Sequence, residues 1–290
     1  MNKFLSTMIV VLIVAIAAAG GLYWWQLRKL GPSGKSVAVT EATAPAPTAS
    51  SAAPPAEPAI EFPIDAAGAE KTTLPPLANS DNYLAGVVGA LVPRSDMLKF
   101  LQLDKFANRV VVTVDNLARP HAAPMLWPVN PAPGRFTTTD AGAASTTINT
   151  TNSQRYTPLV RFIESVDTTK AVALYVNAYP LFQQAYEELG YPRRYFNDRL
   201  VAVIDHLLAT PAARDGLGVK LTEVKGSVAP TRPWVRYEFS DATLESLSSG
   251  QKMMLRAGPD NQARLKVKLR EIRGQITGAV VAKPGDAAKP

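Results

Sequence analysis

Apolar residues recur at helical spacing along most of the segment between residues 77 and 276. The clearest case is residues 197–210. A stripe at positions i, i+3, i+4, i+7 and i+8 is formed there by Leu200, Val203, Ile204, Leu207 and Leu208. Asn197 or Asp198 is positioned to cap this helix, and Pro211 follows its end. Such a stripe is typical of a helix that packs one face against a core.

The same spacing predicts further helices, separated by prolines, glycines and polar caps. We expect them over residues 81–91, 97–101, 106–117, 152–166, 167–178, 181–189, 241–247, 251–257 and 259–276. The segment 106–117 is also rich in β-branched residues, and we prefer a helix because its apolar residues repeat at the helical period. Asn152, Asp167 and Asp241 are positioned as caps.

Two segments of the body lack this helical spacing. Residues 219–228 and 234–239 alternate between apolar and polar side chains and predict a β-hairpin. Residues 121–150 are rich in Pro, Gly, Asn and Thr and predict a long loop, a common place for a functional surface. The predicted fold class of the body, residues 77–276, is therefore mainly α: a multi-helix globular body with a small β-hairpin.

The chain begins with features of a membrane-anchored protein. After a tail of residues 1–3, Phe4 to Leu27 form a run of 24 uncharged residues, most of them apolar. A helix of this length crosses ~30 Å of hydrocarbon, so the run predicts a transmembrane anchor. The alternative is a signal peptide cleaved after residues 17–19, which are all Ala. The flanking cations mildly favour a cytoplasmic body, but long domains translocate regardless of such charges, and we expect an exported body.

Two segments are poor in large apolar residues. Residues 31–73 are dominated by Ala, Pro, Ser and Thr, and residues 279–290 have a similar composition. Such segments cannot bury enough apolar surface to offset the entropy lost on ordering. We therefore predict a disordered Pro/Ala-rich linker at 31–73 and a disordered tail at 279–290.

The amino-acid composition excludes several kinds of functional site. The 290 residues include no Cys and two His, which excludes disulfides, Cys-ligated metal sites, a Cys nucleophile and a three-His metal site from one chain. The net charge is +7, and almost all of the excess positive charge of the body lies in the last two predicted helices, 251–257 and 259–276. The cations of the helix 259–276 are Arg264, Lys266, Lys268, Arg270 and Arg273. They either solvate its outer face or form a contact surface for an anionic envelope polymer, an acidic protein or lipid headgroups.

One constellation suggests catalysis. Asp205 precedes His206 on the predicted helix 197–210, which also carries Arg199. A carboxylate beside a histidine is how many general bases are built, but residues i and i+1 of a helix do not face each other. We therefore favour a structural role for His206 and predict no catalytic, cofactor-binding or metal-ligating residue. If the protein is an enzyme, Asp205, His206 and Arg199 are the candidates.

Other patterns have ordinary explanations. Ser249 to Lys252 matches the S-x-x-K motif of penicillin-recognising serine enzymes, but no K-T-G motif accompanies it. Glu187 and Glu188 are paired carboxylates that we expect on a solvated helix face. The aromatic residues between positions 175 and 196 form either part of the core or a groove for a peptide or a sugar, with Arg193–Arg194 at its rim.

Several blocks of the chain resemble a known family. They are Leu189–Pro192, Phe196–Leu200, Ile204–Pro211, Val114–Leu117 and Ser249–Lys252. Together they resemble the bacterial domain of unknown function 3014 family over about residues 77–273. The resemblance implies a layout of one N-terminal membrane segment, a Pro/Ala linker and a body, and a bacterial envelope-associated protein. It implies no reaction and no catalytic residue.

These features predict a membrane-anchored bacterial envelope protein that is a non-catalytic binding or scaffolding module. It would cross the inner membrane once through residues 4–27, with its body in the periplasm, and would bind an anionic envelope polymer or protein. We expect no cofactor and no nucleic acid partner. One alternative is a hydrolase that acts on an envelope polymer through His206, Asp205 or Glu188. Another is a regulatory or assembly factor that faces the cytoplasm.

Overall fold

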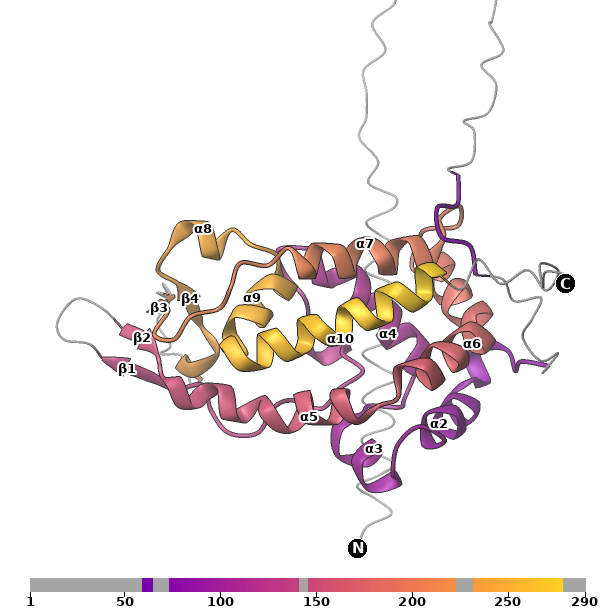
Figure 1. Cartoon of the computed structure of the whole chain (residues 1–290), viewed down its shortest axis with the longest axis horizontal. Helices are drawn as coiled ribbons and strands as arrows, with labels where there is room; N and C mark the ends of the chain where they lie inside the picture. Colours follow the sequence, from indigo (N-terminus) through magenta and orange to yellow (C-terminus); the bar gives the residue numbers. More distant parts are fainter. Residues whose placement is uncertain (1–58, 65–72, 141–145, 223–231, 279–290) are drawn as a thin grey trace, which may run out of the picture. The chain divides into compact units, whose positions relative to one another are not determined.

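A computed structural model describes residues 59–64, 73–140, 146–222 and 232–278 of the chain (Figure 1). The helices of this part are α2 (Asp81–Gly89), α3 (Arg94–Phe100), α4 (Phe106–Leu117), α5 (Thr157–Ser165), α6 (Thr168–Glu188), α7 (Phe196–Leu208), α8 (Ala242–Glu245), α9 (Ser249–Arg256) and α10 (Pro259–Gly278). Its strands are β1 (Thr138–Asp140), β2 (Thr146–Ile148), β3 (Gly218–Leu221) and β4 (Tyr237–Phe239). Short 3₁₀ turns are η2 (Leu77–Asn79), η3 (Pro124–Leu126), η4 (Thr150–Arg155) and η5 (Pro233–Val235). The prediction of a mainly helical body with a small β element is confirmed.

Several predicted segments lie outside the described residues. These are the membrane anchor at 4–27, most of the linker at 31–73, and the tail at 279–290. Within the part that the structure describes, no helix combines the length and the apolar composition that a membrane span requires.

Helices α4, α6, α7 and α10 form the centre of the body. α4 packs against α6 and α7, and α10 lies along α5, α6 and α7 (Figure 1). Val111 of α4 and Phe196 of α7 are completely buried, and the ring of Phe182 from α6 stacks on that of Phe196. Burial of such a side chain stabilises the fold by about 1.5–3 kcal/mol, so these contacts fix the helices that carry the candidate site.

The β-branched segment 106–117 forms helix α4, as predicted. Its buried face includes Ala107 and Val111, one turn apart. The first turn of α4 has no cap from its own N-cap residue, Lys105. Instead, the carboxylate of Asp81 in α2 accepts hydrogen bonds from the backbone N–H groups of Lys105 (2.9 Å) and Phe106 (3.2 Å). A cap supplied by another helix satisfies the same N–H groups as a local one and also ties α2 to α4.

The β element is larger than the predicted hairpin. The strands of the described residues form one antiparallel sheet in the order β1-β2-β3-β4. The predicted hairpin is present as β3 and β4, which pair with Val219 opposite Phe239. β4 is shorter than predicted, and residues 223–228 of the predicted first strand lie outside the described residues. The strands β1 and β2 fall in the segment predicted as loop, and that prediction is wrong at these positions. They are three residues long and pair through Thr-rich sequence, so they carry little of the apolar alternation that marks a strand.

The predicted N-terminal cap of α6 is confirmed, whereas that of α5 is not. Asp167 caps α6 as predicted, because its carboxylate accepts the Lys170 N–H at 3.0 Å, and α6 then continues through Pro180 as one helix. α5 begins at Thr157, later than predicted. The side chain of Asn152 is buried and accepts the backbone N–H of Thr137 at 3.1 Å, so it joins the β1 region to η4 rather than capping a helix.

Neither Asn197 nor Asp198 caps α7, which begins at Phe196. Both side chains instead hold residues 59–64, which we call the strap. Ile64 of the strap is buried in the core next to α6 and α7. For these six residues, the structure differs from the predicted disordered linker, because apolar side chains and paired backbone groups fix them against the body.

Candidate functional site

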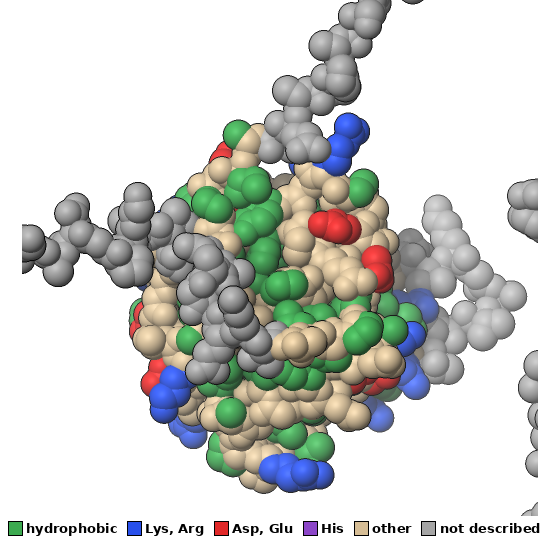
Figure 2. All heavy atoms as spheres, turned by 90° about the vertical axis from the view of Figure 1, so that its right-hand side faces the viewer, with side chains coloured by type: hydrophobic (Ala, Val, Ile, Leu, Met, Phe, Trp, Pro, Cys, Tyr) green, Lys and Arg blue, Asp and Glu red, His purple; other side chains and the backbone are tan. Residues whose placement is uncertain are grey.

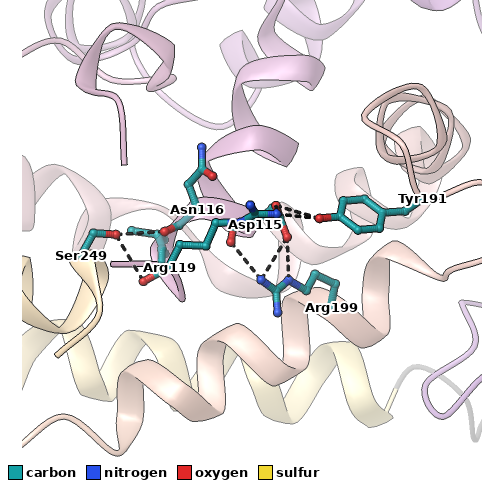
Figure 3. A network of polar contacts seen from close by, with 7 residues as sticks. Asp115, Asn116, Arg119, Tyr191, Arg199 and Ser249 are labelled. Carbon is teal, nitrogen blue, oxygen red and sulfur yellow. Dashed lines mark hydrogen bonds and ion pairs between the residues drawn. The ribbon is translucent and has the colours of Figure 1, made fainter. Parts of the chain in front are cut away.

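A buried carboxylate joins α4 to α7. Asp115, in the last turn of α4, is 4% exposed. Its carboxylate accepts hydrogen bonds from Arg119 Nη2 at 2.6 Å, from Arg199 Nε at 3.0 Å and from the Tyr191 hydroxyl at 3.3 Å. Figure 3 shows Asp115 between the two guanidiniums, with Tyr191 on one side and Asn116 and Ser249 on the other. We call Asp115, Arg119, Tyr191 and Arg199 the Asp115 network.

The network fixes one arginine more firmly than the other. Arg199 Nη2 also donates to the backbone carbonyl of Asp115 at 2.9 Å, so this guanidinium contacts both the side chain and the backbone of α4. Its side chain is 29% exposed, whereas that of Arg119 is 50% exposed. The Asp115 charge raises the pKa of Arg119. The Arg119 guanidinium therefore stays charged, and Arg199 is held in one orientation by paired donors.

An open groove lies beside the network. It has a volume of about 490 Å³. Its walls are the strap, Gln183 and Tyr186 of α6, residues 192–195 of the connection between α6 and α7, and Asp198, Arg199 and Ala202 of α7. We call it the Tyr195 groove. Arg199 belongs both to the groove wall and to the Asp115 network, so the buried carboxylate sets the position of a cation at the groove.

The strap is held along one side of the groove by side chains at the start of α7. The Asp198 carboxylate accepts the N–H groups of Glu61 (3.1 Å) and Phe62 (2.8 Å). The Tyr195 hydroxyl accepts the Ile64 N–H at 2.7 Å. Asn197 Nδ2 donates to the Phe62 carbonyl at 2.9 Å. These contacts are made to the backbone, so this end of α7 binds an extended segment of polypeptide.

The surface at the end of the body where α2 and α6 lie is mostly uncharged. Figure 2 shows hydrophobic side chains gathered in the middle of this face, and Lys and Arg side chains mainly at its margin.

The structure separates the three residues that the sequence offered as catalytic candidates. Arg199 pairs with Asp115, as described above. Asp205 pairs with Arg273 of α10, whose Nε and Nη2 lie 2.5 and 2.9 Å from the two carboxylate oxygens. His206 Nε2 lies 2.8 Å from the hydroxyl of Ser248. Asp205 and His206 therefore serve different neighbours, as their adjacent positions on a helix require.

The contact between His206 and Ser248 has the distance of a nucleophile and its base, but Ser248 is a helix cap. Ser248 is 8% exposed, and its hydroxyl accepts the Gln251 N–H at 3.2 Å. In return, the Gln251 side-chain oxygen accepts the Ser248 backbone N–H, which completes a capping box at the start of α9. The hydroxyl oxygen is thus engaged in the fold and lies beneath the surface.

The two residues that match the S-x-x-K motif, Ser249 and Lys252, also contact different parts of the fold. The Ser249 hydroxyl donates to the Asn116 carbonyl at 2.9 Å, at the end of α4 (Figure 3). Lys252 Nζ is buried and pairs with Glu245 at 2.7 Å. Burial alone would raise the pKa of Glu245, but hydrogen bonds from Lys252 and from the Phe239 N–H lower it.

The cations of α10 are less exposed than the sequence pattern suggested. Arg264 pairs with Glu164 of α5. Lys266 Nζ donates to the Thr210 carbonyl at 2.5 Å, and Lys268 Nζ donates to the Val166 carbonyl at 2.7 Å. These carbonyls lie just after the C-terminal ends of α7 and α5, where cations stabilise the exposed C=O groups. Arg270 is exposed. That these five cations bind a partner stays a prediction.

Sequence reasoning missed Asp115 as a site residue. The signal was its position, because Asp115 follows the buried Val111 by four residues and so lies on the apolar face of a helix. Arg119 follows Asp115 by another four residues. A carboxylate on a buried face needs a paired donor, and an arginine one turn away is such a donor. Its second partner, Arg199, is 84 residues away in sequence and could not be found from spacing.

The fold and the site define a helical module with a ligand-sized groove next to a buried carboxylate–arginine network. The chain belongs to the family described as "Protein of unknown function (DUF3014)", which matches residues 106–273. The matched segment contains the whole Asp115 network and the α6 and α7 walls of the groove, whereas the strap precedes it. The predicted family is therefore confirmed. No curated protein and no solved structure matches the chain.

Proposed function

We propose that this protein is a membrane-tethered, non-catalytic binding module that takes its ligand in the Tyr195 groove. The observation that carries the proposal is the position of Arg199, a cation fixed by a buried carboxylate in the wall of an open groove of about 490 Å³. Small-molecule and peptide sites commonly have volumes of ~300–1,000 Å³ and a few fixed polar groups. A groove wall that is already fixed loses little conformational entropy when a ligand binds.

The internal contacts of the polar candidates favour binding over catalysis. Asp205 is paired with Arg273, the Ser248 hydroxyl caps α9, and Lys252 is paired with Glu245. A nucleophile or a general base must reach the substrate, and these groups reach other helices instead. The Tyr195 groove, in contrast, is open to ligand.

The membrane part of the proposal rests on the sequence. The apolar run at residues 4–27 has the length of a span, and the Pro/Ala-rich segment after it is long enough to hold a module away from the bilayer. In this arrangement the module is exported to the periplasmic side of a bacterial inner membrane, where its partner is an anionic envelope polymer or protein. A fusion of alkaline phosphatase to the C-terminus tests the orientation, because that enzyme is active only after export.

The groove can be tested with a photo-crosslinking residue in the full-length protein in its own cells. Ala202 is exposed and lines the groove, and Ala263 of α10 is an exposed alanine outside it. We expect a crosslinked product from position 202, lost when Arg193 and Arg194 are both changed to Gln, and none from position 263. No product from position 202, or turnover of peptidoglycan, ester or peptide substrates by the purified protein, would contradict the proposal.

A further inference from the structure

The Tyr186 side chain is a candidate hydroxyl donor in the Tyr195 groove. Tyr186 is 2% exposed and lines the groove. Its ring stacks on that of Tyr191, with centroids 4.6 Å apart, and packs against Phe196. Its hydroxyl donates to no residue within the described ranges, although Tyr175, Tyr179 and Tyr191 of the same aromatic cluster all donate. A hydroxyl that bonds to no described residue and belongs to the wall of an open groove can donate to a ligand oxygen.

The charges next to this hydroxyl are mixed. Burial raises the pKa of Tyr186, the guanidiniums of Arg199 and Arg194 act to lower it, and the Asp115 carboxylate acts to raise it. Glu61 and Asp198 also line the groove, but the Asp198 carboxylate is engaged by the backbone of the strap. Arg193 and Arg194 are exposed at the groove, and neither forms an ion pair with an acidic residue that the structure describes. The groove therefore offers a hydroxyl donor and guanidinium donors for a negatively charged oxygen.

The rest of the groove suits a peptide. The strap, which forms one wall, is bound as an extended segment through its backbone, and the groove continues along residues 59–61 of that segment. Tyr195, Pro192 and Ala202 add apolar surface, and the Ile60 side chain is 53% exposed there. A second short polypeptide beside the strap would meet the same apolar surface, with a carboxylate within reach of the arginines.

We infer that the Tyr195 groove binds an acidic peptide segment, with one carboxylate held by the Tyr186 hydroxyl and by Arg193 and Arg194. This inference rests on the proposed binding function and names its ligand class. Arg199 is a positioning residue, because its donors are directed to Asp115 and it shapes the wall rather than supplying a free guanidinium. The site recognises a carboxylate by charge-assisted hydrogen bonds, and the side chains on either side of it by apolar contact.

The test uses two fluorescent tetrapeptides of Leu and Ala that differ only at the C-terminus, one with a free carboxylate and one with an amide. Their affinities for the full-length protein in detergent are measured by fluorescence anisotropy. We expect the free acid to bind at least tenfold more tightly than the amide, because one charge-assisted contact contributes about that factor. Raising the salt concentration should reduce this preference.

Three variants locate the contact. Arg193→Gln with Arg194→Gln should remove the preference for the acid. Tyr186→Phe should weaken binding of the acid about fivefold while leaving the circular dichroism spectrum and the unfolding transition unchanged, since its hydroxyl donates no hydrogen bond to the described part of the fold. Arg161→Gln with Arg214→Gln is the charge-matched control, because both residues are exposed and neither lines the groove. This control should bind like the wild type.

Equal affinity for acid and amide, or binding that survives the Arg193/Arg194 change, overturns the inference. Arginine-dependent binding to vesicles that contain anionic lipid, without binding of the peptide acid, also overturns it in favour of a lipid headgroup. Either result is compatible with a crosslink from position 202 and leaves the binding module standing. Absence of that crosslink when Arg193 and Arg194 are unchanged is the separate outcome that removes the proposed function.

Discussion

Gly250 and Gly274 give a test of the packing on which the site depends. Both glycines lie within helices, Gly250 in α9 and Gly274 in α10. A Cβ atom added at Gly250 would lie 2.6 Å from Leu207 Cδ2 and 2.8 Å from the Leu117 carbonyl oxygen. At Gly274, no heavy atom of the described residues lies within 4 Å of the new Cβ, the helix's own nearby backbone aside. The two Gly→Ala changes are therefore chemically identical and differ in surroundings.

The expected effects have opposite signs. In an unobstructed helix, Gly→Ala stabilises by roughly 0.5–1 kcal/mol because alanine restricts the unfolded chain. Overpacking typically costs about 1–3 kcal/mol. At Gly250 one close atom is a backbone oxygen, which moves only if α4 moves. The Ser249 N–H also donates to the Arg119 carbonyl at 2.7 Å, which holds α9 against α4. We therefore expect the cost to exceed the gain, with net destabilisation of about 1–2 kcal/mol at Gly250 and stabilisation of about 0.5–1 kcal/mol at Gly274.

Urea denaturation of the full-length protein in detergent, followed by near-ultraviolet circular dichroism, measures both changes. Gly250→Ala should lower the denaturation midpoint, and Gly274→Ala should raise it, with the slope unchanged. Because α9 meets α4 next to Asp115, the Gly250 variant should also weaken binding in the Tyr195 groove. If both variants shift the midpoint in the same direction by similar amounts, the close approach of α9 to α4 and α7 is wrong.

Three further predictions concern charges and hydrogen bonds. Asp115→Asn should lower the free energy of unfolding by about 2–4 kcal/mol, because two arginines lose a buried counter-charge. The control is Asp104→Asn, at a carboxylate that is 71% exposed. In the same urea titration it should change the free energy of unfolding by less than about 0.5 kcal/mol. The pKa of Glu245 is lowered in the fold by Lys252, so its stabilising effect is complete above about pH 4.5 and is lost as the pH falls further. Glu245→Gln should therefore flatten the loss of thermal stability between pH 5 and 3, and an unchanged slope would refute this. His206→Ala should lower stability by about 1 kcal/mol and leave peptide affinity within twofold; loss of all function in a stable variant would indicate catalysis.

Much of the helical layout could be predicted because it depends on local pattern. Helix α7 buries Val203, Ile204 and Leu207 of the predicted stripe, and α4 is helical despite its β-branched residues. These positions repeat at the period of the helix, and a single chain segment contains the whole signal. The short strands β1 and β2 contain no comparable signal, since three-residue strands are specified mainly by the neighbours with which they pair.

Helix α10 shows where local pattern fails. It is rich in charged residues, which the sequence predicted either on a solvated outer face or on a contact surface for a partner. In the structure the helix lies against α5, α6 and α7, and most of its cations contact these neighbours. Long cationic side chains can cover apolar surface with their methylene groups while their charged ends reach an acceptor. For Lys266 and Lys268 the acceptors are backbone carbonyls that end other helices. A sequence does not identify such acceptors, because they are backbone atoms of segments that are distant in sequence.

The sequence suggested a possible groove with Arg193–Arg194 at its rim and offered Arg199 as a candidate, but it did not show how the site is assembled. The first turn of α7 illustrates the reason. Tyr195, Asn197, Asp198 and Arg199 follow one another within five residues, and in an isolated helix each would be an ordinary polar residue. Successive residues of a helix point about 100° apart, so this single turn reaches two partners at once. Asp198 and Tyr195 hold the strap, and Arg199 reaches Asp115 on the other side. The groove lies between these two sets of contacts, so its shape is determined by segments more than 80 residues apart and becomes visible only when the chain is folded.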